Sequence, residues 1–318
     1  MAISLSRFLA RRAALLVLTL WLVSLGVFVV SELLPGDVAI FILGQQATPE
    51  LLAVLRQQLG LNEPPPVRYV TWLTHFLRGD WGRSLALQVP IADLVLSRTV
   101  NSLVLAVLAL VLTIPVSIGL GLVAALRAGR FADRLISLVG LSGLALPEFV
   151  TGVVLIVVFS LTLHLAPASA QIPTGASPLS VLPALVLPAI TLAVTLFAYI
   201  SRMTRASAVE VLASDYVRTA VLKGLPMFQV VVRHVLRNAL LPTVTVIGAQ
   251  IGWLVGGLVV VEHLFGYPGL GDLLLFAALN KDVPLLEACV MVVASVYMLS
   301  NLGAELLFGV LNPRIRYA

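Results

Sequence analysis

The residue with the most suitable local setting for nucleophilic chemistry is Ser142, which lies in the segment Gly140-Leu-Ser-Gly143. A serine nucleophile needs a base such as histidine within hydrogen-bond reach of its hydroxyl group. His164 lies 22 residues further along the same apolar run, about 33 Å away in a straight helix. His263 is the other histidine next to an apolar run. The indication of hydrolase chemistry is weak, because small residues also fill the seams between membrane helices.

Two acids and a second histidine are candidates for a solute path. Glu148 is the one acid deep in an apolar run, and an ionisable residue at such depth is a functional candidate by default. It directly follows Pro147, so a structural hydrogen bond is the competing interpretation. Glu262 and His263 end another apolar run, with Asp272 nearby. These three could meet an external protein or narrow an outer gate, or they could simply be solvated loop residues.

The sequence indicates that the chain holds no catalytic group, metal or cofactor of its own. Its two lysines, Lys223 and Lys281, do not follow the glycine pattern of a phosphate-binding loop. Its single cysteine, Cys289, excludes a disulfide framework. The four histidines are scattered without the spacing of metal ligands; they are His75, His164, His234 and His263.

The elements that must position these residues are membrane helices. Apolar residues make up 60% of the chain and charged residues 11%, against about 45–50% and about 25% in a soluble domain. The basic residues form no stripe with interleaved aromatic residues, so nucleic acid is not expected as a partner. Six apolar runs are each near the roughly 20 residues that cross a bilayer: Ala13–Val30, Asn101–Leu126, Leu135–Leu165, Val181–Ser201, Ala239–Val261 and Ala288–Ala304. We therefore expect an all-α integral membrane protein with six transmembrane helices.

The distribution of basic residues predicts that both termini are cytoplasmic. In that orientation the termini and the loops 127–134 and 202–237 hold fourteen of the 20 Lys and Arg residues, as the positive-inside bias requires. Residues 1–34 then form the N-terminus and first helix, 35–98 a long extracytoplasmic loop, and 99–318 a five-helix core that contains a cytoplasmic segment, 202–240.

The long loop has predicted structure of its own. Thr48 can cap a helix that has Pro49 at its first position and Gly60 after its end. The run of prolines up to Pro66 predicts an extended break. A second short helix is expected over residues 69–77.

The polar stretch 215–242 interrupts the apolar chain and predicts two amphipathic helices joined in an elbow. Asp215 can cap the first helix, Val217, Ala220 and Val221 share its apolar face, and Gly224 supplies a left-handed stop. Pro226 begins the second helix, whose expected apolar face is Phe228, Val231, Val232, Val235 and Ala239. Such helices could lie on anionic membrane lipid, but a capped helix with a sharp turn is more than lipid binding requires.

Three glycines of the fifth run, Gly248, Gly252 and Gly256, are spaced four apart. Their bare faces align, which allows another helix to approach closely. We expect a packing seam there, against a neighbouring helix or a partner subunit.

Taken together, these segments resemble a known family. Tyr216-Val-Arg-Thr-Ala-x-x-Lys-Gly-Leu225 and Arg233-His-x-Leu-Arg-Asn-Ala-Leu-Leu-Pro242 are similar to the cytoplasmic "EAA" loop of ABC importer permeases of the dipeptide, oligopeptide and nickel subfamily, with Arg218-Thr219-Ala220 in place of the Glu-Ala-Ala triplet. The resemblance covers nearly the whole chain. Its other segments, in the same order as in the subfamily, are Leu34-Pro-Gly-Asp37, Ala47-Thr-Pro49 with Leu59-Gly-Leu61, Leu77-Arg-Gly-Asp-Trp-Gly-Arg-Ser84, Val261-Glu-His-Leu-Phe-Gly-Tyr-Pro-Gly-Leu-Gly271 and Asn312-Pro-Arg-Ile-Arg316.

The resemblance implies a permease subunit in the cytoplasmic membrane of a bacterium or archaeon. Its partners would be a homologous second permease, one or two ATPase subunits that use ATP and Mg²⁺, and an extracytoplasmic solute-binding protein. The helix from Asp215 to Gly224 would dock on an ATPase and couple its closure to alternating access of the spans. The residues implied in this coupling are Asp215, Tyr216, Arg218, Thr219, Ala220, Lys223 and Gly224.

Two other classes of function stay open at the level of sequence. Gly140-Leu-Ser-Gly143 is similar to the Gly-x-Ser-Gly segment of rhomboid intramembrane serine proteases. An autonomous secondary transporter would need no ATPase partner. The transported solute also stays open, because the subfamily handles dipeptides, oligopeptides, glutathione-like peptides and nickel complexes.

Overall fold

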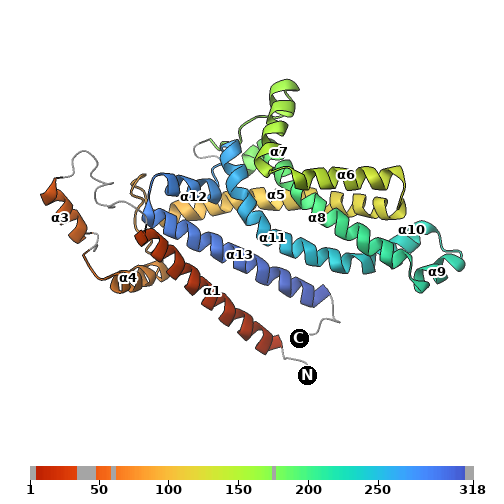
Figure 1. The fold of residues 1–318 in the computed structure, drawn as a ribbon, viewed down its shortest axis with the longest axis horizontal. Helices are drawn as coiled ribbons and strands as arrows, with labels where there is room; N and C mark the ends of the chain where they lie inside the picture. The colour runs from red at the N-terminus through yellow and green to blue at the C-terminus, as the bar shows by residue number, and fades with distance from the viewer. Residues whose placement is uncertain (1–4, 34–47, 59–61, 174–176, 312–318) are drawn as a thin grey trace.

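The computed structural model describes residues 5–33, 48–58, 62–173 and 177–311, and within these ranges the chain is built from helices that mostly run along one long axis (Figure 1). Five helical stretches of the described residues are long and apolar enough to cross a membrane. The main helices of these stretches are α1 (Leu5–Leu33), α5 (Ile91–Leu126), α8 (Val186–Leu212), α11 (Arg237–Phe265) and α13 (Val283–Leu311). The predicted all-α membrane architecture is confirmed for this part of the chain.

The third predicted span, Leu135–Leu165, is not one straight helix. It consists of α6 (Phe131–Ala145) and α7 (Glu148–Leu155), which are bent by 110° and followed by a π-helical turn, η2 (Ile156–Thr162). Leu146 at the break is extended, with φ −91° and ψ 130°. The cause is Pro147, because the residue before a proline is disfavoured in the helical region. The spans number six only if this bent pair counts as one.

Two other spans are longer than the apolar runs indicate. A 3₁₀ segment, η3 (Pro178–Leu185), leads directly into α8. The short helix α10 (Met227–Val230) and the π-helical segment η4 (Val231–Leu236) lead without interruption into α11. The second arm of the predicted elbow is therefore the beginning of the fifth span.

Figure 1 places the predicted loop helices and the elbow at opposite ends of the long axis. α3 (Pro49–Gln58), α4 (Pro65–Leu77) and α12 (Leu270–Leu279) lie at one end, and α9 (Asp215–Leu222) lies at the other with α10. This arrangement agrees with the prediction that the long loop and the elbow face opposite sides of the membrane. The helix α12 was not predicted from the sequence.

The loop helices confirm one predicted boundary and correct another. The Thr48 hydroxyl accepts a hydrogen bond from the Leu51 N–H at 3.3 Å, so Thr48 caps α3 as expected. α4 begins at Pro65 instead of near Tyr69, because prolines fit the first turn of a helix, where the N–H groups have no intrahelical acceptor. The motif segments 34–37 and 312–316, Ala47, and Leu59-Gly-Leu61 with the predicted stop at Gly60 lie outside the described residues.

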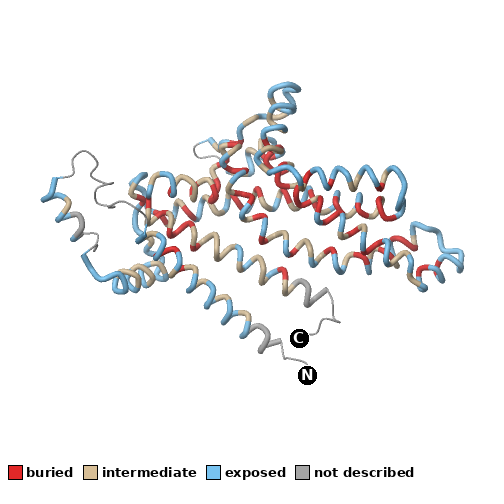
Figure 2. The backbone as a smooth tube through the Cα atoms, viewed as in Figure 1, coloured by how far each residue is buried: buried red, intermediate tan, exposed pale blue. Residues whose placement is uncertain are grey.

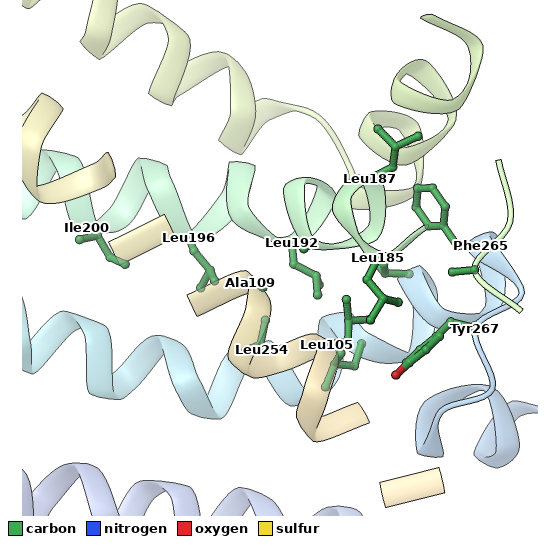
Figure 3. Packing of buried hydrophobic residues seen from close by; sticks show 14 residues of the cluster. Leu105, Ala109, Leu185, Leu187, Leu192, Leu196, Ile200, Leu254, Phe265 and Tyr267 are labelled. Atoms are coloured by element: carbon green, nitrogen blue, oxygen red, sulfur yellow. The ribbon is translucent and has the colours of Figure 1, made fainter. Parts of the chain in front are cut away.

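The main core lies where α5, α8 and α11 meet. Half of the most apolar part of the span that contains α8 is buried, against 17% of that of α1, so α8 is the central helix and α1 lies at the periphery (Figure 2). Figure 3 shows side chains from the three helices packed together, with Phe265 and Tyr267 closing the cluster. The labelled members are Leu105, Ala109, Leu185, Leu187, Leu192, Leu196, Ile200, Leu254, Phe265 and Tyr267.

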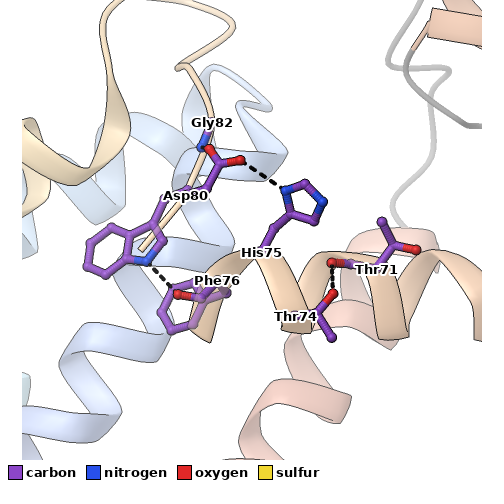
Figure 4. A network of polar contacts seen from close by, with 7 residues as sticks. Thr71, Thr74, His75, Phe76, Asp80 and Gly82 are labelled. Carbon is purple, nitrogen blue, oxygen red and sulfur yellow. Dashed lines mark hydrogen bonds and ion pairs between the residues drawn. The ribbon is translucent and has the colours of Figure 1, made fainter. Parts of the chain in front are cut away.

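The connection between α4 and α5 folds into a compact turn. The Trp81 indole N–H donates to the Phe76 carbonyl at 3.0 Å, and the two rings stack with centroids 4.9 Å apart (Figure 4). His75 and Asp80 are joined by a 2.9 Å hydrogen bond. Further along, the Ser84 hydroxyl donates to the buried Asp282 carboxylate at 2.5 Å, which ties this turn to the start of α13.

Candidate functional site

The elbow begins with α9, whose two ends are set by local sequence. Asp215 is the first helical residue, and Ser214 precedes it as the N-cap without a side-chain capping bond. The predicted Asp215 cap is therefore wrong by one position, although a carboxylate in the first turn still favours the helix dipole. Gly224 has φ +77°, the left-handed conformation that only glycine adopts without strain. Its predicted role as the helix stop is confirmed.

One face of α9 packs against the second arm of the elbow. Val217 and Ala220 are buried in a cluster with Val230, Val235 and Ala239. Val221 was expected on this face but is half exposed. In the second arm, Val231 is buried as predicted, whereas Phe228 and Val232 are exposed. The difference arises in η4, because the wider π-helical turn changes which residues share a face.

Two polar side chains of this segment form hydrogen bonds, and two basic side chains are exposed. The Asn238 side-chain amide donates to the Tyr216 hydroxyl at 3.1 Å, which links α9 to α11. The Thr219 hydroxyl donates to the Asp215 carbonyl at 2.8 Å within the helix. Arg218 and Lys223 are exposed and form no ion pair among the residues the structure describes. Their charges are available to a partner.

The outer surface of the elbow is apolar. Leu222 is 79% exposed and Phe228 78% exposed, the largest values in this segment. We call the exposed set the elbow patch; its members are Val221, Leu222, Leu225, Met227, Phe228 and Val232. Exposed apolar side chains gathered in one short segment next to basic residues favour an interaction site.

An ion pair behind the elbow was missed by the sequence analysis. Asp133 of α6 is buried and accepts two hydrogen bonds from the Arg205 guanidinium of α8, at 2.5 and 2.7 Å. The Gly129 N–H also donates to this carboxylate, at 2.8 Å. The pair fixes the start of α6 to the part of α8 that leads into α9. Arg205 was counted only as a basic residue of a loop and Asp133 was not singled out, and their separation of 72 positions gave no signal.

Glu148 lies directly after the 110° break and packs on a glycine of the fifth span. A Cβ atom built on Gly257 would lie 2.8 Å from Oε2 of Glu148, so the absence of a side chain at Gly257 makes room for the carboxylate. The other oxygen, Oε1, is buried without a hydrogen-bond partner in the described part of the chain. The structure thus places Glu148 at a helix–helix contact, and its role in a pathway stays a prediction.

Glu262 is fully buried and holds the beginning of α12. Its carboxylate accepts hydrogen bonds from the Ser102 hydroxyl at 2.5 Å and from the Gly271 and Asp272 N–H groups at 2.7 and 3.1 Å. A Cβ atom on Gly269 would overlap this carboxylate. His263 is exposed and pairs with Asp272 at 3.0 Å. The two neighbours predicted as gate residues therefore face different surroundings, and the outer-gate role of either stays a prediction.

The three glycines predicted to form a seam also differ in their surroundings. Gly248 and Gly252 are buried in α11. A Cβ atom on Gly252 would lie 2.9 Å from the Tyr297 ring, so this glycine allows α13 to approach. Nothing lies within 4 Å of a Cβ atom built on Gly256. The seam is intramolecular at Gly252, and Gly256 borders open space.

The described residues contain no group of three metal-ligating side chains. Ser142 lies on α6 and His164 follows η2, both exposed, and no hydrogen bond between them is present in the described part of the chain.

The arrangement at the elbow, an exposed apolar and basic surface on a helix joined to two spans, is that of a contact surface.

Comparison with known proteins identifies the family. Residues 117–317 match the family described as binding-protein-dependent transport system inner membrane component, and residues 5–118 match the N-terminal part of such membrane components. A probable peptide ABC transporter permease protein, y4tP, of Sinorhizobium fredii is 36% identical over 98% of this chain and 99% of its own length. The glutathione transport system permease protein GsiC of Escherichia coli K12 is 37% identical with the same coverage. The chain therefore belongs to the family of inner-membrane components of binding-protein-dependent transport systems.

Proposed function

We propose that this chain is the permease subunit of an ABC importer that carries peptides or related small solutes across the cytoplasmic membrane by alternating access. The mechanism is inferred from the elbow, where a rigid helix with an exposed apolar and basic surface joins two membrane spans. Both relatives described above are named as permeases of ABC-type or glutathione transport.

The energy for transport is supplied by separate ATPase subunits. They bind ATP and Mg²⁺ and dock on the elbow. Leu222 and Phe228 are exposed enough to enter a groove on such a partner, and apolar anchors of this kind dominate the energy of protein interfaces. Arg218 and Lys223 lie beside them and favour an acidic rim on the groove. The elbow then faces the cytoplasm.

Movement of α9 reaches the spans by two routes. Toward α11, α9 is held by the buried contact of Val217 and Ala220 and by the Tyr216–Asn238 hydrogen bond. Toward α8, it is joined by the short turn at Ala213 and Ser214. A rigid-body rotation of α9 would therefore tilt both spans together, which is the kind of motion that alternating access requires.

The solute reaches the other end of the chain from an extracytoplasmic binding protein, and it passes between this chain and a homologous second permease. α3, α4 and α12 lie at that end, opposite the elbow (Figure 1). The names of the relatives point to peptides and glutathione as the class of solute. Both termini are then cytoplasmic.

The test is uptake into proteoliposomes that contain this chain, its second permease, the ATPase subunits and the binding protein. Uptake of trialanine or S-methylglutathione should require ATP on the elbow side and should stop when any one component is omitted. Uptake by this chain alone, driven by an ion gradient, would show a secondary transporter instead. Proteolysis of a membrane substrate that Ser142→Ala abolishes would support the protease alternative.

A further inference from the structure

A hollow of about 700 Å³ opens on the side of the fifth span, between α8, α11 and α13. Three aromatic side chains line it, one from each helix: Tyr199, Trp253 and Tyr297. None of the residues that line it is charged. A concave surface of this size, apolar with a few polar groups, is the usual form of a small-molecule site.

One lining residue, Gln250, has a polar group without a partner. Its Oε1 atom is buried and accepts no hydrogen bond from any residue that the structure describes. Gln250 lies 11 residues from both Ala239 and Val261, which places it about 16 Å from either end of the apolar run. A side-chain amide at that depth costs free energy unless it meets a hydrogen-bonding group. Because Gln250 also lines the hollow, a turn of its side-chain amide would bring the unpaired oxygen to a donor that enters the hollow.

The two glycines beside Gln250 shape the hollow. Gly252 lets the Tyr297 ring pack against α11, which fixes one wall. At Gly256 a side chain would meet nothing within 4 Å. The space left free by the absence of a side chain at Gly256 is therefore part of the hollow. No described residue of this chain packs into that space.

We propose that this hollow is where the transported solute contacts this chain, with the Gln250 amide hydrogen-bonded to a peptide group of the solute. The proposal rests on the function proposed above and assigns the residues of the path. The side-chain amide oxygen accepts the bond from a peptide N–H of the solute, a donor that an ester lacks. The aromatic side chains pack on the apolar parts of the solute. The uncharged lining neither pairs with a charged side chain nor holds a free metal cation, because such ions require carboxylate, imidazole or thiolate ligands.

The other occupant that fits a hollow on this face is the second permease. The two occupants differ in what they require of Gln250 and Gly256. A solute that visits the hollow requires a group that hydrogen-bonds to peptides and a space that opens to water. A permanent subunit contact requires that the space be filled and closed.

The first experiment measures uptake by the complete reconstituted complex at a solute concentration well below saturation, where a loss of affinity lowers the rate. The probes are trialanine and its depsipeptide analogue, in which esters replace the amides and remove the N–H donors. Gln250→Met should lower the uptake of trialanine roughly three- to tenfold, the effect of one lost hydrogen bond. It should leave uptake of the ester analogue at the wild-type rate. Gln57→Met on α3, an exposed position at the far end of the chain, is the matched control and should change neither.

Equal losses for both solutes, or no loss for trialanine, would overturn the proposal. A wild-type complex that takes up neither trialanine nor S-methylglutathione would count against the proposed function itself, and with it the site. That outcome is read from the wild type alone, so the two failures are distinguishable.

The second experiment tests access to the hollow. The chain has one cysteine, Cys289, which is buried. In a Cys289→Ala background, Gly256→Cys should react with a water-soluble methanethiosulfonate in the assembled complex, and trialanine should slow the reaction. Phe131→Cys, at an exposed residue at the start of α6, should react without protection. If Gly256→Cys is inert and Gly256→Leu prevents co-purification of the second permease, the hollow is a subunit interface and the proposal is wrong.

Discussion

The Asn238 side chain donates a hydrogen bond of 3.1 Å to the Tyr216 hydroxyl, 22 residues earlier in the chain. This bond joins the outer side of α9 to the beginning of the fifth span. It lies beside the buried contact made by Val217 and Ala220. The elbow is therefore held at two places, and a force applied to α9 is transmitted to α11.

Removal of this hydroxyl should weaken coupling without weakening assembly. Tyr216→Phe loses one exposed hydrogen bond, worth about 0.5–1.5 kcal/mol, and keeps the ring. We expect fewer solute molecules transported per ATP hydrolysed, with the ATPase subunits still bound. Tyr69→Phe is the control, because it removes a hydroxyl that bonds Ser24 at 2.8 Å in another part of the chain. An unchanged transport ratio in Tyr216→Phe would show that this bond transmits nothing.

The elbow patch should determine affinity for the ATPase subunits. Leu222→Ser leaves the stability of this chain within about 0.5 kcal/mol, because the side chain is exposed. It should weaken ATPase binding roughly tenfold or more, as loss of an interface anchor does. Titration of purified ATPase into the permease measures the effect. Leu279→Ser, at a leucine that is 71% exposed at the end of α12, should bind as the wild type does, and equal binding by both variants would rule out the patch.

The buried Glu262 carboxylate should stabilise the start of α12. Glu262→Gln keeps one acceptor oxygen where the carboxylate has two, so either the Ser102 hydroxyl or the Gly271 and Asp272 N–H groups lose their acceptor. We expect the free energy of unfolding to fall by about 1–3 kcal/mol, the penalty for unpaired buried groups. The loss should appear as a lower temperature of thermal unfolding and as faster proteolytic cleavage near Gly269. Glu305→Gln is the matched control, since its ion pair with Arg12 is partly exposed and such pairs contribute about 0–1 kcal/mol. Equal shifts in the two variants would contradict the anchoring role.

Local structure was predictable where the signal lies within a few residues. The Thr48 cap and the Gly224 stop were found because side-chain chemistry fixes the backbone nearby. The break at Pro147 was not predicted, because prolines act differently from one helix to the next. Pro115 and Pro242 remain inside helices. A proline alone therefore does not tell whether a helix continues.

Long-range polar contacts were out of reach of the sequence. Glu262 and Ser102 are 160 positions apart. Glu262 was predicted as a possible gate or loop residue, and nothing in the sequence pointed to Ser102 as its partner. The faces of the elbow were predicted with a period of 3.6 residues, which fails across the π-helical segment η4. The elbow and most of its buried face, Val217, Ala220, Val231, Val235 and Ala239, could thus be predicted from sequence, whereas the exposure of Val221, Phe228 and Val232 could not.

The turn between α4 and α5 should respond to acid only at low pH. The hydrogen bond with His75, and then the one from the Gly82 N–H, lower the pKa of Asp80 below its ordinary value of 3.8. These bonds favour the charged carboxylate, so their stabilisation is complete above pH 3.8 and is lost as the pH falls through the lowered pKa. Hydrogen exchange of the Gly82 N–H, corrected for its intrinsic pH dependence, should stay slow down to that pH. Asp80→Asn should remove the response, and loosening of the wild type between pH 7 and pH 5 would contradict the assignment.

The coupling role of α9 is the central claim, and a double charge reversal tests it most directly. Arg218→Glu with Lys223→Glu changes two exposed side chains that form no ion pair among the described residues, so the fold should persist. The measurement is substrate-stimulated ATP hydrolysis by the complete complex with its binding protein. We predict that the stimulation is lost while the separated ATPase subunits keep their own rate. Stimulation at the wild-type level would contradict the role of α9 as the link between ATP hydrolysis and the membrane spans.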